Sequence, residues 1–210
     1  MEVDRPAPGE ELNTGAETVA RPAATVIVMR GGSEALEVLL VQRNPQSRFM
    51  GGAWVFPGGA VTADDGRDLE AALRAAALRE LAEEAGVELE GPDELVPFSR
   101  WITPAQVKIR FDTWFFLAAL PDGAVPRADG QEVIDARWYA PRAALDAGRD
   151  GQLLLVFPTI KHLEQLAGFP SAAALLDHTR GREVVPVEPR VLVSGETARV
   201  VLPGEPGYEA

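Results

Sequence analysis

Apolar positions along this 210-residue chain are grouped into short runs separated by turn residues. Runs of this kind, rich in β-branched residues, predict buried strands at 23–29, 36–41 and 54–56. Gly31-Gly32-Ser33 separates the first two runs and predicts a turn between antiparallel strands. By the same pattern, further strands are expected at 95–101, 111–120 and 133–139.

The region 67–85 has the period of a helix instead of that of a strand. Leu69, Leu73, Ala76 and Ala77 form one apolar stripe, and a second stripe contains Leu78, Leu81, Ala82 and Ala85. Gly86 follows at the position where a left-handed cap would end the helix. Glu80 continues the line of the first stripe, where a fully solvated glutamate is not expected.

The second half of the chain predicts shorter helices and a β-rich end. Short helices are expected after Pro141 and Pro158, and Ser171 is a candidate N-cap for another. Alternating patterns at 184–187, 190–193 and 198–202 are typical of strands. Strands and helices are interleaved without regular βαβ units, so we expect an α+β fold with a mixed sheet and helices on both of its faces.

The charge balance excludes some classes of partner. A formal net charge of −12 at pH 7 argues against electrostatic binding to nucleic acid or to an anionic membrane surface. The first residues lack the basic and apolar regions of a signal peptide, and no run approaches the roughly 18 apolar residues of a membrane span. Cysteine is absent, which excludes disulfides and thiolate chemistry. A cytoplasmic protein is therefore the expectation.

Three glutamates, Glu80, Glu83 and Glu84, lie at i, i+3 and i+4 near the end of the predicted long helix. This spacing brings their Cβ atoms within about 5–6 Å of one another, where like charges repel. One interpretation is a solvated face on which Arg79 and Glu83 form an i, i+4 ion pair. The other is a site for a hard divalent cation such as Mg²⁺ or Mn²⁺, which prefers carboxylate oxygens.

The residues around these glutamates resemble a known signature. Arg79-Glu80-Leu81-Ala82-Glu83-Glu84-Ala85-Gly86-Val87, preceded by Phe56-Pro57-Gly58-Gly59, resembles the metal-binding box of the Nudix hydrolases. The resemblance implies a Nudix-type α/β/α sandwich with a C-terminal extension of helix and strand. It divides the chain into a mobile N-terminal tail at 1–20, a Nudix core at 21–150 and an extension packed on the core at 151–210.

The glycine half of the signature departs from the family pattern. Between Gly59 and Arg79 the chain has about six residues more than the ungapped signature, so the first acidic residue of the box is Asp64, Asp65 or neither. Insertions here occur in a branch similar to peroxisomal coenzyme A diphosphatases. Segments 48–59, 101–116 and 202–208 also resemble that branch.

The resemblance implies hydrolysis of a phosphoanhydride in a nucleoside diphosphate linked to another group, with coenzyme A or an acyl-CoA as the expected substrate. Mg²⁺ or Mn²⁺ would activate the attacking water. By resemblance, Glu80, Glu83 and Glu84 are the metal ligands, one of them able to take the water's proton, with Arg79 orienting a box glutamate and the Gly59 carbonyl approaching the metal. Further candidates, some with equally good structural explanations, are Glu132 as an extra base or ligand, and Arg43, Arg48, Gly58 and Arg110 as substrate-binding residues.

Other interpretations remain open at this point. Alternative substrates are ADP-ribose, NADH and nucleotide sugars, and an alternative role is that of a catalytically silent ligand sensor. A homodimer is possible, and binding of nucleic acid or membrane is not expected. Phe49, Trp54 and Trp114 could stack on a base or pack in the core. His162 and His178 have no metal-ligand company in the sequence and are interpreted as structural.

Overall fold

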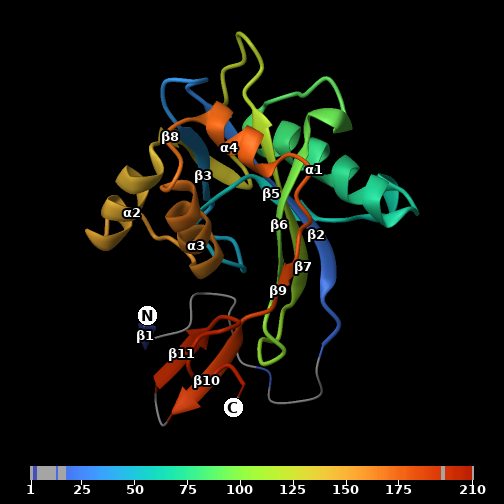
Figure 1. Cartoon of the computed structure of the whole chain (residues 1–210). Coiled ribbons are helices and arrows are strands. Elements are labelled where there is room, and N and C mark those ends of the chain that lie inside the picture. The colour runs from blue at the N-terminus through green and yellow to red at the C-terminus, as the bar shows by residue number, and fades with distance from the viewer. Residues whose placement is uncertain (1, 4–12, 14–17, 195–196, 210) are drawn as a thin grey trace.

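The computed structural model describes residues 2–3, 13, 18–194 and 197–209. Figure 1 shows a central sheet with helices on both sides and a small separate sheet at the C-terminal end. The first half contains β1 Glu2–Val3, β2 Arg21–Arg30, β3 Glu37–Arg43, β4 Trp54–Val55, β5 Gly58–Ala60, α1 Leu69–Ala85, β6 Val96–Ile102 and β7 Phe111–Ala119. The second half contains β8 Val133–Tyr139, α2 Pro141–Arg149, α3 Phe157–Leu166, α4 Ala172–Thr179, β9 Pro186–Val187, β10 Arg190–Ser194 and β11 Thr197–Val201.

The central sheet is mixed, as the sequence predicted. Its strands follow the order β4-β3-β2-β7-β6-β9, with β5 also paired to β2 and β8 to β3. Strands β2 and β7 are parallel, with a register from Arg21↔Phe111 to Met29↔Ala119. Strands β2 and β3 form an antiparallel pair at Met29↔Val38.

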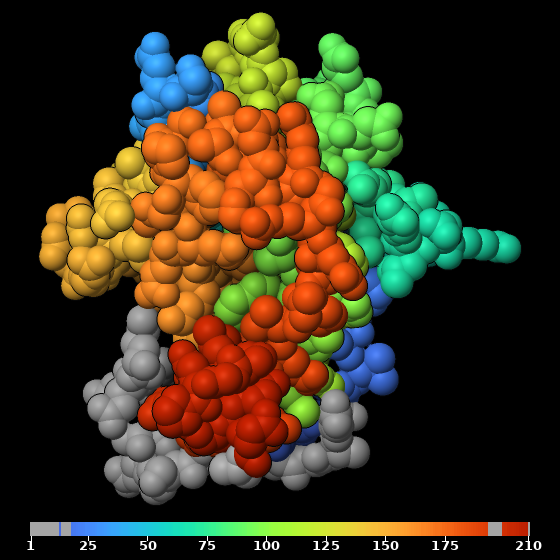
Figure 2. Space-filling model, viewed as in Figure 1, coloured from blue at the N-terminus to red at the C-terminus, as the bar shows by residue number. Residues whose placement is uncertain are grey.

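Each face of the sheet is covered by helix, and the side chains of β2 show why. Because successive strand residues point to opposite faces, Val26 and Val28 pack with α1 while Ile27 and Met29 pack with the helices that follow β8. A strand buried on both faces gives the continuous apolar run seen in the sequence. Figure 2 shows α3 and α4, in orange, lying in front of the sheet on the second face. The predicted α+β fold with helices on both faces is confirmed.

Local signals explain where α1 begins and ends. Asp68 is its N-cap, with a side chain that accepts a hydrogen bond from the Ala71 N–H, so the helix begins at Leu69 and not at the expected residue 67. Gly86 has φ of 62° and ends the helix as predicted. Leu69 is 54% exposed, so it does not belong to the buried stripe in which the sequence placed it.

The segment Gly58–Ala60, for which the sequence analysis predicts no strand, forms strand β5. It pairs antiparallel with β2 at Ala23↔Ala60, Ala24↔Gly59 and Thr25↔Gly58. Two adjacent glycines give no β-pattern in the sequence, which is why the strand was missed. Its pairing places the two glycines beside the C-terminal half of α1.

The C-terminal end forms a separate small sheet in the order β1-β11-β10, so its predicted strands are present. The expected mobile tail at 1–20 lies mostly outside the described residues, and the pairing of Glu2–Val3 with β11 was not predicted. Within the described ranges, no helix combines the length and apolar character needed to cross a bilayer.

Candidate active site

The site is built where the second half of α1 faces strand β5. An added Cβ on Gly59 would lie only 2.3 Å from Oε1 of Glu80, so the carboxylate occupies the space that any other side chain would fill. An added Cβ on Gly58 would lie 2.4 Å from the carbonyl oxygen of Ala24. Both glycines are therefore required by close approach, one to a neighbouring strand and one to a glutamate.

Glu84 is the most buried carboxylate of the helix, at 2% exposure, whereas the sequence had singled out Glu80 as the unusual one. Its Oε2 accepts a hydrogen bond of 2.9 Å from the Gly58 N–H, and its Oε1 lies 3.7 Å from Nη1 of Arg43. Burial raises the pKa of the Glu84 carboxyl to about 7, and the nearby charges of Glu80 and Glu132 act in the same direction. Gly58 was expected to bind substrate, but its N–H already donates to Glu84.

Arg79 neutralises the other two glutamates of the set. Its Nη1 lies 2.7 Å from Oε1 of Glu80 and 3.1 Å from Oε2 of Glu83, and its Nη2 donates to the Ala60 carbonyl. The side chain of Glu80 is 13% exposed and that of Glu83 is 60% exposed. Burial raises the pKa of Glu80, although Arg79 opposes the shift. The i, i+4 ion pair of Arg79 and Glu83 is thus present, but as part of a larger arrangement than a solvated helix face.

The structure separates the two acidic candidates in the inserted loop. Asp65 accepts two hydrogen bonds from one edge of the Arg79 guanidinium, with Nε to Oδ1 and Nη2 to Oδ2 each at 3.0 Å, and its side chain is 4% exposed. The hydrogen bonds from Arg79 lower the pKa of Asp65. Asp64 is exposed. Asp65 is therefore the loop acid that contacts the box arginine.

A shallow cavity of about 430 Å³ adjoins the buried Glu84 through Arg43. Its lining comes from the loop after β3 and from the loop before β8: Arg43, Asn44, Gln46, Ser47, Arg48, Phe49, Gln131 and Glu132. Glu132 raises the pKa values of both Glu80 and Glu84, which places its charge close to theirs. The structure thus brings together Arg43, Arg48 and Glu132, which the sequence had nominated from separate segments.

Arg110, also expected to bind substrate, is used differently. It is 6% exposed and donates to the carbonyl oxygens of Thr103 and Thr18 and to the carboxylate of Glu188. These contacts join the end of the sheet to the C-terminal extension. Arg110 is therefore not included in the proposed substrate-binding site.

The aromatic and histidine candidates are mostly occupied by packing. Trp54 is 4% exposed, and the ring of Phe49 contacts Phe111 edge to face. His162 is 1% exposed and lies among the rings of four aromatic residues, Phe56, Phe98, Trp101 and Phe115. His178 contacts the ring of Phe169.

The fit of a divalent cation can be judged from the donors and their charges. In the described part of the chain, no three acidic or histidine side chains converge as they stand on one metal position. The reason is that Glu80 and Glu83 turn toward Arg79, which supplies the positive charge a cation would supply. The donors are hard oxygens, and burial, with a smaller contribution from neighbouring carboxylates, raises the pKa values of Glu80 and Glu84. The carboxylates of α1 therefore fit Mg²⁺ or Mn²⁺, provided that Glu80 and Glu83 turn from Arg79 to the cation.

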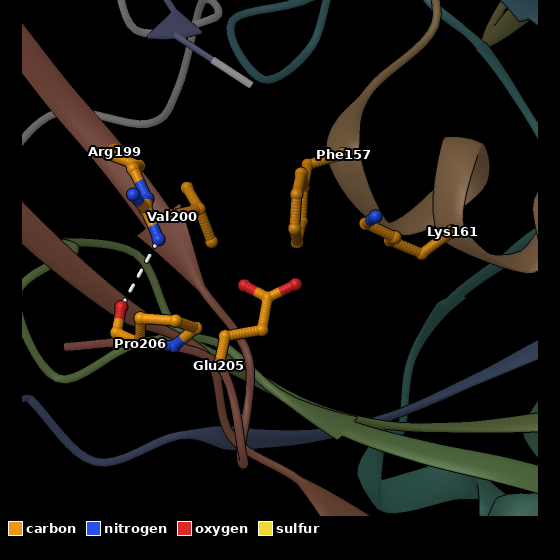
Figure 3. A pocket seen from close by; sticks show the side chains of 6 residues that line it. All are labelled: Phe157, Lys161, Arg199, Val200, Glu205 and Pro206. Carbon is orange, nitrogen blue, oxygen red and sulfur yellow. Dashed lines mark hydrogen bonds between the residues drawn. The ribbon is translucent and has the colours of Figure 1, made fainter. Parts of the chain in front are cut away.

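A second cavity, of about 300 Å³, lies between α3 and the C-terminal hairpin and is lined by Phe157, Lys161, Arg199, Val200, Glu205 and Pro206 (Figure 3). Its charged groups have local partners. Arg199 donates to the Pro206 carbonyl, Lys161 pairs with Glu164, and Glu205 accepts from the Leu202 N–H. It contains one carboxylate against two cations, so it is not a counterpart of the acidic site on α1.

Comparison with known proteins gives one family. A family model described as the NUDIX domain matches residues 19–156. The chain is 28% identical over 181 residues to putative nudix hydrolase 7 of Caenorhabditis elegans, covering 70% of this chain and 60% of that protein. It is 29% identical over 116 residues to the human acyl-coenzyme A diphosphatase NUDT19, covering 53% of this chain and 31% of that protein. The chain thus spans less than two thirds of either relative.

Solved structures agree with the fold. A NUDIX hydrolase from Alicyclobacillus acidocaldarius is 32% identical with a TM-score of 0.68, covering 77% of this chain and 97% of that one. The NUDIX domain of Shewanella oneidensis NrtR, solved with ADP ribose, is 20% identical with a TM-score of 0.52, covering 70% and 86%. The second likeness concerns the fold alone. The family and the fold expected from the sequence are confirmed, and the expected hydrolase class agrees with the names of these relatives.

Proposed function

The chain belongs to the NUDIX family, and from that premise we propose that it is a metal-dependent diphosphatase whose substrate is coenzyme A or an acyl-CoA. The observation that carries the proposal is the set of carboxylates on α1, Glu80, Glu83 and Glu84, packed against the glycine strand β5. The acyl-coenzyme A diphosphatase among the relatives and the inserted loop before α1 support the choice of substrate.

In this proposal Glu80, Glu83 and Glu84 hold Mg²⁺ or Mn²⁺, together with the carbonyl of Gly59. When bound, the cation neutralises the diphosphate and makes the attacking water more acidic. Glu84 is held in place by the Gly58 N–H, and the absence of a side chain on Gly59 leaves room for the Glu80 carboxylate. Arg79 stays anchored to Asp65 while Glu80 and Glu83 turn from it to the cation.

The cavity beside Arg43 binds the phosphates. Arg43 bridges between Glu84 and the loop carbonyl of Phe49, so its guanidinium faces both the metal ligands and the cavity. Arg48 lines the same cavity, and in the described part of the chain no hydrogen bond or ion pair of its side chain is found. Arginine suits this task because its planar guanidinium matches phosphate oxygens in pairs.

A substrate panel tests the proposal. We expect turnover of coenzyme A and acetyl-CoA with Mg²⁺ or Mn²⁺, giving an adenosine bisphosphate and a phosphopantetheine product. In ¹⁸O-labelled water the label must enter one product phosphate. Turnover of ADP-ribose, NADH or dinucleoside polyphosphates without turnover of any CoA species would show that the substrate is not a CoA compound. Binding without turnover of any of them would indicate a ligand sensor.

A further inference from the structure

The backbone of Gln131 and Glu132, just before β8, is held by hydrogen bonds from two directions. From the end of β3, the Asn44 N–H donates to the Glu132 carbonyl at 2.8 Å, and Nδ2 of Asn44 donates to the Gln131 carbonyl at 2.8 Å. From the other side, the Asp129 carboxylate accepts the N–H of Glu132 at 3.0 Å and that of Val133 at 2.9 Å. Successive peptide groups around Glu132 are thus fixed.

Such fixing is more than an exposed loop requires. Glu132 and Asp129 are both exposed, so water could satisfy the peptide groups of this segment. The hydrogen bonds instead set the direction in which the Glu132 side chain leaves the backbone. That side chain lines the cavity shared with Arg43 and Arg48. Its charge also makes a small contribution to the raised pKa values of Glu80 and Glu84.

We propose that Asn44 and Asp129 are positioning residues, which hold the Glu132 carboxylate at the mouth of the metal and phosphate site. The proposal rests on the proposed function. Glu132 acts there as a proton acceptor for the attacking water or as a further oxygen ligand for the cation. Asn44 acts through Glu132 and also links it to the strand that carries Arg43, so the carboxylate and the guanidinium keep a constant relative position.

A double-mutant cycle separates this role from simple support of the loop. The variants are Asn44→Ala, Glu132→Gln and both together, with kcat, KM and the affinity for Mn²⁺ measured for each. We expect Asn44→Ala to lower kcat by about 10- to 100-fold with a small change in KM, since a general base contributes ~10²–10⁴-fold when correctly placed. In the Glu132→Gln background, Asn44→Ala should lower kcat less than about twofold further.

Asp129→Asn and Asp122→Ala complete the design. Asp122 lies in the same connection between β7 and β8, and its side chain is exposed. We expect Asp129→Asn to reproduce the Asn44→Ala effect in part, since one carboxylate oxygen is replaced by a donor that cannot accept the N–H. Asp122→Ala should leave kcat, KM and Mn²⁺ affinity at their original values.

The outcomes are separable from those of the proposed function. Equal losses from Asn44→Ala in both backgrounds, or a fall in melting temperature without a fall in kcat, would overturn the positioning role. If no nucleotide is turned over at all, the proposed function fails, and Mn²⁺ affinity still decides the inference. In either role the negative charge of Glu132 lies at the metal site and attracts the cation. Glu132→Gln and Asn44→Ala must therefore each weaken Mn²⁺ binding several-fold, with no further loss when combined; additive losses or none would contradict the positioning role.

Discussion

Arg79 sets the charge balance of the site at the scale of single residues. One edge of its guanidinium is held by Asp65, and the other reaches Glu80 and Glu83, which are the proposed metal ligands. A cation and Arg79 therefore compete for the same carboxylates. If those carboxylates turn to a metal ion, Asp65 is the partner that keeps the guanidinium anchored, so we expect it to favour metal binding.

Removing the charge of Asp65 should weaken metal binding. In Asp65→Asn, Arg79 loses its buried ionic partner and stays on Glu80 and Glu83, so we expect the Kd for Mn²⁺ to rise about 3- to 10-fold, or roughly 1 kcal/mol. Isothermal titration with Mn²⁺ measures this. The matched control is Asp64→Asn, because Asp64 is exposed beside Asp65. Equal affinities for both variants would show that Asp65 has no part in metal binding.

Gly59 should be intolerant of even a methyl group. In Gly59→Ala the new Cβ would meet the Glu80 carboxylate at 2.3 Å, so Glu80 must move away. We expect turnover to fall by about 10²-fold, because a shift of ~1 Å in a positioned group can have this effect. Gly91→Ala is the control, since nothing lies within 4 Å of the added Cβ. Unchanged turnover in Gly59→Ala would show that Glu80 is not part of the active site.

At the scale of elements, periodicity predicted most of the fold but not the details of the site. The strands at 23–29 and 111–120 and the helix ending at Gly86 follow from patterns that depend on neighbouring residues only. Strand β5 could not be predicted from the sequence, because its pairing with β2 is a tertiary contact. The burial of Glu84 was missed for the same reason: helical spacing groups the glutamates but does not say which of them meets the Gly58 N–H.

The choice between Asp64 and Asp65 also needed the structure. Both are acidic and adjacent, and only the conformation of the inserted loop directs Asp65 to Arg79. Nothing in the sequence pattern connects Asn44 or Asp129 with Glu132. Their role depends on two loops, far apart in sequence, which meet at Glu132.

Helix α3 is docked by a histidine whose protonation should control stability. Nδ1 of His162 donates to the Pro158 carbonyl at 2.7 Å, and Nε2 accepts from the Ser99 hydroxyl at 2.6 Å, within an aromatic cluster. Burial lowers the pKa of His162 to about 4. The unfolded chain, with a pKa of about 6.5, therefore binds more protons between these values, and stability falls as the pH falls from 6.5 toward 4.

Comparison of the original chain with His162→Gln isolates this contribution, since the carboxylates titrate in both. Over this window we expect the free energy of unfolding to fall more steeply in the original chain, by up to about 1.4 kcal/mol per pH unit. Urea unfolding at pH 5, 6 and 7 measures the difference. Parallel pH profiles for the two proteins would show that His162 is not kept neutral by burial.

At the scale of the whole molecule, Arg110 joins the central sheet to the C-terminal extension. Its guanidinium reaches the Thr18 and Thr103 carbonyls and Glu188, and the hydroxyl of Tyr208 donates to the Glu188 carbonyl. Replacing a buried, hydrogen-bonded charge leaves its partners unsatisfied. We expect Arg110→Met to lower the free energy of unfolding by about 2–4 kcal/mol while the Kd for Mn²⁺ stays unchanged. Weaker Mn²⁺ binding by Arg110→Met without a loss of stability would instead show that Arg110 belongs to the binding site.

The proposed function requires that Glu80, Glu83 and Glu84 on α1, packed against strand β5, hold the cation for hydrolysis of a diphosphate. The most direct test is the turnover of coenzyme A as a function of Mn²⁺ concentration, for the original chain and for Glu84→Gln, with thermal unfolding confirming that both are folded. We predict saturable, Mn²⁺-dependent turnover that falls by at least about 10²-fold in Glu84→Gln. Equal turnover by the two folded proteins, or turnover that needs no divalent cation, would contradict it.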